Sequence, residues 1–149
     1  IKVGITRKLP SRWIDQGAVQ ALSILTVQNR LHSGLVEKQI SQWMADKTNW
    51  RKMLKNEVEL RNLEESRDEV LDKLAAFPEI SELARPVEDA EPLSINYPVL
   101  EYPTKIKSHN LEKTPVVEGT LQGIKGQYFI LDNGVLNIRK YTGYHLTVT

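Results

Sequence analysis

The sequence predicts an α+β fold: a small antiparallel sheet with helices, followed by a small antiparallel β-barrel or curled β-sheet. Two observations predict it. Residues 34–77 carry apolar side chains at the three-to-four-residue spacing of helices, whereas residues 116–139 form short runs of β-branched, aliphatic and aromatic residues separated by glycines. We therefore expect an α+β module at 1–83, a linker at 84–98 and a small β-domain at 99–149.

The first elements follow from local patterns. Residues 1–6 alternate between apolar and other side chains, which predicts a half-buried strand. Pro10 and Ser11 predict the start of a short helix, because proline fits the first helical turn, and Gly17 stops it. Residues 20–29 are rich in β-branched and aliphatic side chains and predict a second strand.

Two longer helices are expected next. Ser33 is suited to cap a helix over 34–45. Its apolar residues share one face, and Glu37 lies beside that face. A long helical pattern then runs over 50–77 until Pro78 ends it.

In the rest of the chain the spacing of apolar residues changes from that of helices to that of strands. Residues 84–98 contain three prolines and an acidic cluster, which indicate a linker. Asp132-Asn133-Gly134 predicts a hairpin turn, because Asn and Gly tolerate positive φ. The expected strands are 116–124, 127–131 and 135–139, and Gly119, Gly123, Gly126 and Gly143 suggest bulges or sharp corners.

The net charge of +1 conceals a segregation along the chain. Residues 1–55 hold ten Lys or Arg against three acids, a net +7; residues 56–92 hold four bases against twelve acids, a net −8; the remainder is +2. A basic module is what a binder of phosphate backbones requires. The alternative is a set of solvated lysines that cluster by chance or pair with the acidic helix that follows, and both interpretations stay open.

Composition excludes several classes. There is no cysteine, which removes disulfides and thiolate metal sites and makes the cytoplasm the expected compartment. His32, His109 and His145 are scattered, so no zinc site is expected within these residues. No apolar run approaches 18 residues and no signal-peptide pattern is present, so we expect no membrane partner.

The run KVGIT at 2–6, Arg12 eight residues after Gly4, Glu37, and Asn49 twelve residues after Glu37 resemble the core of a GIY-YIG nuclease domain. In that family a strand ending in a tyrosine-x-glycine turn precedes an arginine, a metal-binding glutamate on a helix, and an asparagine. Lys2 stands at the position of the strand tyrosine. The family's first strand, with its other tyrosine, is expected upstream of Ile1.

The resemblance implies roles for particular residues. Arg12, Glu37 and Lys2 would occupy the catalytic positions, with Glu37 as the ligand of Mg²⁺ or Mn²⁺, and Arg12 able to grip a phosphate bidentately. The residues expected to contact nucleic acid are Thr6, Arg7, Lys8, Asn49, Arg51 and Lys52. Lys2 lacks the chemistry of a tyrosine base, so we expect weak or no cleavage by this chain.

Each of these residues also has a structural interpretation. Arg12 is exposed or pairs with Asp15 one turn on. Glu37 is a first-turn carboxylate favoured by the helix dipole. Asn49 caps the helix that begins at Trp50. These interpretations stand beside the catalytic ones.

A longer set of segments, KVGITR, RWIDQGA, SGLVE, DKTNWRKML and GTLQGIKGQYFILDNGVLNIRKYTGY, resembles an uncharacterised bacterial family catalogued as domain of unknown function 2797. This resemblance spans nearly the whole chain. Relatives carry cysteines and a short Val-Tyr-Leu-like strand upstream of the segment matching KVGIT, and on that comparison the chain is expected to be a fragment.

The expected function is nucleic-acid binding, DNA or RNA, with metal-dependent phosphodiester cleavage as its catalytic form. The alternative is a catalytically inactive adaptor that binds a protein partner through the β-domain. The nuclease interpretation predicts that strands 1–6 and 20–29 pair antiparallel. It also predicts that Arg12 and Glu37 share one cleft within about 10 Å, a span that a hydrated metal and a phosphate can bridge.

Overall fold

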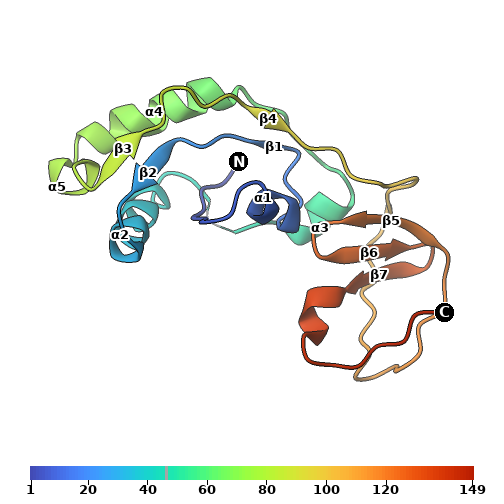
Figure 1. Ribbon diagram of the computed structural model, residues 1–149. Helices are drawn as coiled ribbons and strands as arrows, with labels where there is room; N and C mark the ends of the chain where they lie inside the picture. Colours follow the sequence, from blue (N-terminus) through green and yellow to red (C-terminus); the bar gives the residue numbers. More distant parts are fainter. Residues whose placement is uncertain (46) are drawn as a thin grey trace. The chain divides into compact units, whose positions relative to one another are not determined.

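A computed structural model describes residues 1–45 and 47–149 (Figure 1). The chain divides into two compact units that do not follow the order of the sequence. The first unit consists of 1–12, 19–48 and 59–95, and the second of 13–18, 49–58 and 96–149. Each unit has its own apolar core.

The first unit combines helices with two short ladders. Its helices are α2 (Arg30–Ile40), α4 (Leu63–Ala75) and α5 (Pro78–Ser81), and the short helix α1 (Ser11–Asp15) begins in it. Its strands pair antiparallel: β1 (Gln20–Ala21) with β4 (Leu93–Ser94), and β2 (Leu25–Val27) with β3 (Ala84–Pro86). The core lies between α2 and α4, where Val36 and Ile40 meet Val70 and Leu74.

The prediction of a strand over residues 1–6 is wrong. Lys2 forms only an isolated parallel bridge with Ala45, supported by a hydrogen bond of 2.9 Å from Val3 N to Ala45 O. The predicted pairing of 1–6 with 20–29 is also wrong, because β1 and β2 pair with β4 and β3. An alternating pattern of a few residues forms a strand only when a partner edge lies beside it.

Residues 84–98 are more than a linker. Their prolines disfavour a central strand, yet a short edge ladder tolerates proline at its end, as Pro86 opposite Leu25 illustrates. Both return strands, β3 and β4, lie within this segment and close the two ladders of the first unit.

The helix predicted at 34–45 begins and ends earlier. Asn29, not Ser33, is the N-cap of α2, and its side chain accepts a hydrogen bond of 2.9 Å from His32 N. Ser33 is buried inside the helix, where its hydroxyl donates to Arg30 O at 2.7 Å. Asparagine and serine are both good caps, so the sequence alone does not choose between them.

The single long helix predicted over 50–77 is wrong, because the structure forms two separate helices there, α3 (Trp50–Leu54) and α4. After α3 the chain turns at Asn56, whose φ of 55° is left-handed. A new helix, α4, begins at the Asn62 cap, which accepts hydrogen bonds from the backbone N–H groups of Glu64 and Glu65. Two asparagines with the chemistry of helix ends thus interrupt an otherwise continuous apolar pattern.

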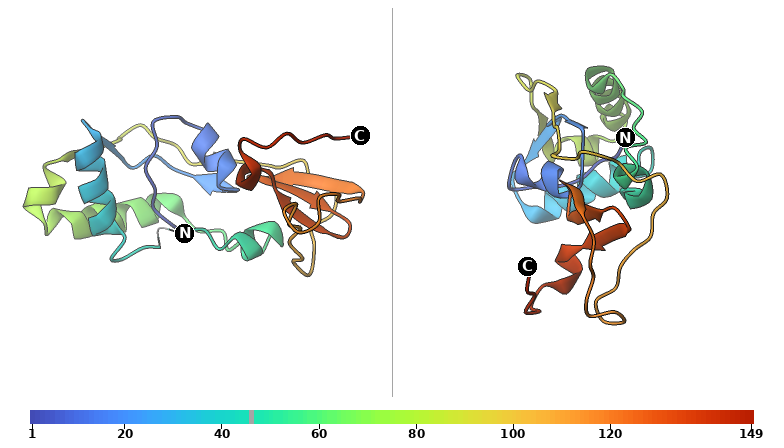
Figure 2. Two further views of the ribbon diagram at one scale, coloured as in Figure 1. Left: turned by 90° about the horizontal axis from the view of Figure 1, so that it is seen from below. Right: turned by 90° about the vertical axis from the view of Figure 1, so that its right-hand side faces the viewer.

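The second unit is built on a three-stranded antiparallel sheet. It consists of β5 (Leu121–Lys125), β6 (Tyr128–Leu131) and β7 (Gly134–Asn137), followed by a short 3₁₀ helix, η1 (Ile138–Tyr141). Figure 2 shows the three strands side by side in orange. The predicted hairpin is confirmed, because Leu131 pairs with Gly134 across Asp132 and Asn133.

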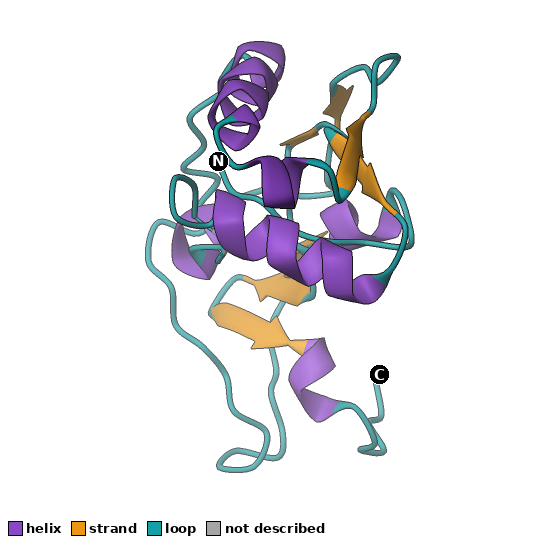
Figure 3. Ribbon diagram, turned by 90° about the vertical axis from the view of Figure 1, so that its left-hand side faces the viewer, coloured by secondary structure: helices purple, strands orange, loops and turns teal. Residues whose placement is uncertain are grey.

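The core of the second unit joins the sheet to α3. Leu54 is fully buried with Ile130 and Val135. The segment between β4 and β5 is mostly loop (Figure 3), but it adds two backbone bridges to the sheet, at Val99 and at Ser108.

The α+β class is confirmed. Among the described residues the C-terminal sheet is open rather than a closed barrel, and a register shift between Leu121 and Gly123 bends it. No helix within residues 1–45 and 47–149 has the length and apolar character needed to cross a membrane.

Candidate functional site

Three of the predicted nucleic-acid contacts, Thr6, Arg7 and Lys8, lie in the loop before α1. Thr6 fixes this loop: its hydroxyl donates to Lys8 O at 3.0 Å and accepts from Lys8 N at 2.9 Å. Arg7, Lys8 and Arg12 are all exposed. None of the three takes part in an ion pair with a described residue. The loop and the start of α1 therefore present three cations to solvent.

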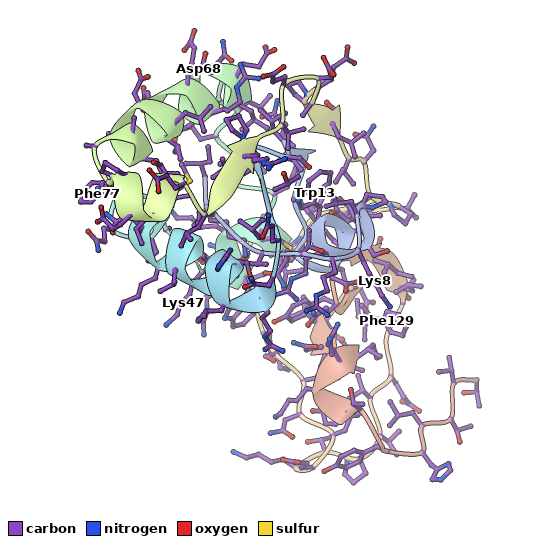
Figure 4. The ribbon with its side chains drawn as sticks, turned by 60° about the vertical axis from the view of Figure 1, so that its left-hand side comes forward. Lys8, Trp13, Lys47, Asp68, Phe77 and Phe129 are labelled. Carbon is purple, nitrogen blue, oxygen red and sulfur yellow. The ribbon has the colours of Figure 1, made fainter. Side chains whose placement is uncertain are left out.

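The alternative interpretation, pairing with the acidic helix, is not found for this loop among the described residues. Asp15, the residue that spacing suggested for Arg12, is ion-paired with Arg139 at 3.4 Å in the second unit. Within the first unit, Asp68 on α4 and the side chains of Lys8 and Lys47 stand well apart in Figure 4. The positive charge of the loop is left uncompensated by ion pairs.

Glu37 lies on α2 and is half-buried beside the buried Val36. Because α2 begins at Arg30, Glu37 lies beyond the first turn, so the helix-dipole interpretation of this carboxylate is wrong. Among the described residues, no three His, Asp or Glu side chains are grouped as metal ligands would be. A Mg²⁺ ion at Glu37 would therefore depend on water and substrate phosphate to complete much of its shell.

The remaining predicted residues fall in two different places. Lys2 belongs to the first unit, in the backbone bridge to Ala45. Asn49, Arg51 and Lys52 belong to the second unit, on α3. The set that sequence spacing placed in one site is thus distributed over both units.

Asn49 has the structural role that the sequence offered as the alternative. Its side chain accepts a hydrogen bond of 3.2 Å from Lys52 N and so caps α3. Arg51 and Lys52, in the first turn of α3, are basic and exposed. The Arg51 guanidinium lies 4.3 Å from the centroid of the Trp50 ring, and Trp50 stacks on Tyr128 with planes 5° apart and centroids 5.8 Å apart. These contacts hold Arg51 in place without neutralising it.

The structure also reveals a buried lysine that sequence reasoning missed. Lys125 is fully buried at the end of β5. Its Nζ donates to Asn56 Oδ1 at 2.8 Å and lies 5.0 Å from the centroid of the Tyr102 ring and 5.4 Å from that of Tyr97. Strand alternation in a Gly-rich segment gave no indication that a charged side chain would point inward.

Burial dominates the electrostatics around Lys125. It lowers the pKa of the Lys125 ammonium, because desolvation penalises the charged form. Burial also raises the pKa of Tyr102 and raises that of Tyr97 to about 12, the latter with smaller contributions from Tyr102 and Asp15. The Tyr97 hydroxyl donates to Ala18 O at 2.8 Å and approaches Ile14 O at 3.3 Å. The Lys125–Asn56 hydrogen bond links the end of β5 to the turn that follows α3.

Comparison with known protein families gives one match. The model of a family described as protein of unknown function (DUF2797) matches residues 1–146. The chain belongs to the DUF2797 family. A search of the curated proteins and a search of the solved structures each found no significant match. Membership in this family assigns no chemistry to the chain.

Proposed function

We propose that this DUF2797 protein binds nucleic acid through the phosphate backbone, with the loop from Thr6 to Arg12 as the principal contact. The observation that carries the proposal is the trio of exposed side chains, Arg7, Lys8 and Arg12, none of them in an ion pair with a described residue. Cations that are already free of protein partners lose little on meeting a phosphate, and they release counterions from the nucleic acid.

The chemistry of the trio suits phosphate. An arginine guanidinium can hold two phosphate oxygens at once, and a lysine ammonium acts as a point charge beside them. The Thr6–Lys8 hydrogen bonds restrict the loop before any ligand arrives, which reduces the entropy lost on binding.

Arg51 and Lys52 form a second, smaller group in this proposal. Arg51 is held over Trp50, and guanidinium planes accept the faces of unpaired bases as well as phosphate. We therefore propose that the protein prefers single-stranded segments over a uniform duplex. The cytoplasm, expected from the absence of cysteine, is the proposed compartment.

A metal-dependent catalytic role, taken from the GIY-YIG resemblance, is the further step of the proposal, although the strand pairing that this resemblance predicts is not formed. Glu37 would be a ligand of Mg²⁺ or Mn²⁺, and Arg12 would stabilise charge on the phosphate. Lys2 replaces the tyrosine of that family, so cleavage by this chain is expected to be weak or absent. In a cleavage assay with Mg²⁺ or Mn²⁺, Glu37→Ala should abolish any product while leaving binding intact; product that survives this change would exclude Glu37 as a catalytic residue.

The binding proposal is tested by fluorescence anisotropy with labelled single strands and duplexes of DNA and RNA at low salt. The variant Arg7→Ala/Lys8→Ala/Arg12→Ala should bind at least about tenfold more weakly, since hydrogen bonds to charged groups are worth roughly 1.5–3 kcal/mol each. The matched control is Arg61→Ala/Lys73→Ala/Arg85→Ala, which removes the same charge from exposed positions of the same unit. Equal losses in both variants would show that only net charge matters.

The adaptor function remains the second candidate because of one observation on the second unit. Leu100, Val116 and Val148 expose 89%, 71% and 84% of their surface, which is high for apolar side chains in one small unit. If the protein binds no nucleic acid at low salt, a protein partner for this unit becomes the better proposal.

A further inference from the structure

The second unit contains a hollow of 400 Å³ that none of the predicted site residues line. Its walls come from the loop that precedes β5 and from the β6–β7 turn. The polar side chains that line it include Lys107, Ser108, His109, Lys113, Thr114 and Asn133. Volumes of this order are typical of sites for small ligands.

The loop that forms the hollow is fixed to the sheet. His109 N donates to Val135 O at 2.9 Å, and Val135 N donates to Lys107 O at 2.8 Å. Beyond this bridge, Asn110 shapes the next turn by accepting a hydrogen bond from Glu112 N at 3.0 Å. The residues lining the hollow are therefore held in place before a ligand binds, which lowers the cost of binding.

A short chain of hydrogen bonds orients His109. Asn133 Nδ2 donates to Glu118 O at 2.6 Å, and because a backbone carbonyl only accepts, the amide nitrogen must face it. The amide oxygen then faces His109 Nε2 at 3.0 Å, which places the ring proton on Nε2.

The other ring nitrogen stays open. His109 Nδ1 has no hydrogen bond to a described residue and is not among the buried atoms that lack a partner, so solvent reaches it. Gly134 makes this orientation possible: a Cβ there would come within 2.5 Å of His109 Nε2 and 2.7 Å of Lys107 O. The ring can lie against β7 only because residue 134 has no side chain.

The charges of the hollow favour an anion. Lys107 and Lys113 are exposed, and neither forms an ion pair with a described residue. Glu118 is the one carboxylate among the lining residues, so the two ammonium groups outnumber it. A different hollow, lined in part by Glu82 and Arg85, has balanced charges and makes no comparable case.

We propose that this hollow binds the phosphate group of a small molecule, such as a nucleoside monophosphate. Lys107 and Lys113 donate to the phosphate oxygens, and His109 Nδ1 hydrogen-bonds to a phosphate hydroxyl or a sugar hydroxyl. Ser108 and Thr114 supply further donors at the wall. This inference is independent of the proposed nucleic-acid contact in the first unit.

The test is an NMR titration of the full chain at constant ionic strength. Inorganic phosphate and a nucleoside 5′-monophosphate should each produce saturable shifts of the His109 ring and Lys113 resonances, whereas the matching nucleoside should not. Oligonucleotides with and without a 5′-phosphate distinguish recognition of a terminal phosphate from recognition of a nucleic-acid strand. Equal binding of both to the hollow would show that it does not recognise the phosphate of a small molecule, and would overturn the proposal.

The variants that test this site change exposed side chains, so that a loss of binding does not reflect a loss of folding. Lys107→Ala/Lys113→Ala should weaken phosphate binding by about tenfold or more, and Glu118→Gln should strengthen it, because one repulsive charge is removed. Lys105→Ala is the matched control, being exposed and close in sequence but absent from the wall. The absence of saturable shifts, or an equal loss in the control, would refute the proposed site.

Discussion

Lys125 and Tyr97 show how burial sets the properties of single residues in this protein. A buried ammonium needs a hydrogen-bond acceptor, and Asn56 Oδ1 supplies it. A buried phenol needs an acceptor for its proton, and the carbonyl of Ala18 supplies that. Burial disfavours the charged form of each group, so it raises the pKa of Tyr97 and lowers the pKa of Lys125.

The raised pKa of Tyr97 predicts a loss of stability at alkaline pH. An unfolded tyrosine titrates near pH 10, whereas Tyr97 in the folded state titrates at about pH 12. Between these values the unfolded state binds fewer protons than the folded state, so the free energy of unfolding falls as pH rises. Urea denaturation at pH 8, 10 and 11.5, followed by circular dichroism, should show this decline.

The variant Tyr97→Phe isolates the contribution of this hydroxyl. It should lose about 1 kcal/mol of stability at pH 8, where the hydrogen bond to Ala18 is intact in the wild type. Between pH 10 and 11.5 the free energy of unfolding of this variant should fall less than that of the wild type. A smaller decline should remain because the pKa of Tyr102 is raised too. An unchanged slope in this variant would show that Tyr97 does not govern the alkaline transition.

Among the elements, β5 depends on a glycine at its register shift. Gly123 forms a backbone bridge with Val99, and the segments around it exchange hydrogen bonds of 2.7 Å, from Leu100 N to Gln122 O, and 3.1 Å, from Ile124 N to Pro98 O. A Cβ at position 123 would lie 2.6 Å from Val99 Cα. The close approach of the two backbones therefore requires glycine.

Gly123→Ala should destabilise the second unit by about 2 kcal/mol or more, because the neighbour that must move is backbone rather than a flexible side chain. Gly34→Ala gives a contrasting control: Gly34 lies within α2, a Cβ there meets nothing within 4 Å, and alanine should raise stability by roughly 0.5–1 kcal/mol. Urea denaturation measures both. Similar small effects at the two positions would contradict the close approach at Gly123.

At the scale of the whole molecule, the segregation of charge along the chain says more about attraction of charged ligands than the net charge of +1 does. Residues 1–55 carry a net charge of +7, which is shared between the two units. Residues 56–92 carry twelve acids and only four bases. The basic residues of 1–55 would attract a ligand with many negative charges.

This arrangement predicts a steep dependence of nucleic-acid binding on salt. The logarithm of the binding constant should fall linearly with the logarithm of salt concentration, with a slope of about 0.9 for each duplex phosphate that is neutralised. Anisotropy measured from about 50 to 200 mM salt gives this slope. For Arg7→Ala/Lys8→Ala/Arg12→Ala the slope should be smaller by roughly two to three, and a slope equal to that of the wild type would exclude phosphate contacts by this loop.

By itself, the sequence determined the features that a few neighbouring residues control. The Asp132-Asn133-Gly134 turn, the Asn49 cap and the end of α1 at Gly17, with its φ of 69°, depend on local hydrogen bonds and backbone freedom. The α+β class follows from the change of hydrophobic period. Of the candidate site, the sequence identified a basic segment and the exposed residues within it.

Only the tertiary structure decided which distant segments meet. It paired β1 and β2 with strands at 84–94, divided the helical pattern of 50–77 between two units, and buried Lys125 against Asn56. It also assembled the hollow around His109 from a loop and a turn that are 24 residues apart at the His109–Asn133 contact. Pairings of this kind depend on which apolar faces pack together across the whole fold, and no local pattern of residues encodes that choice.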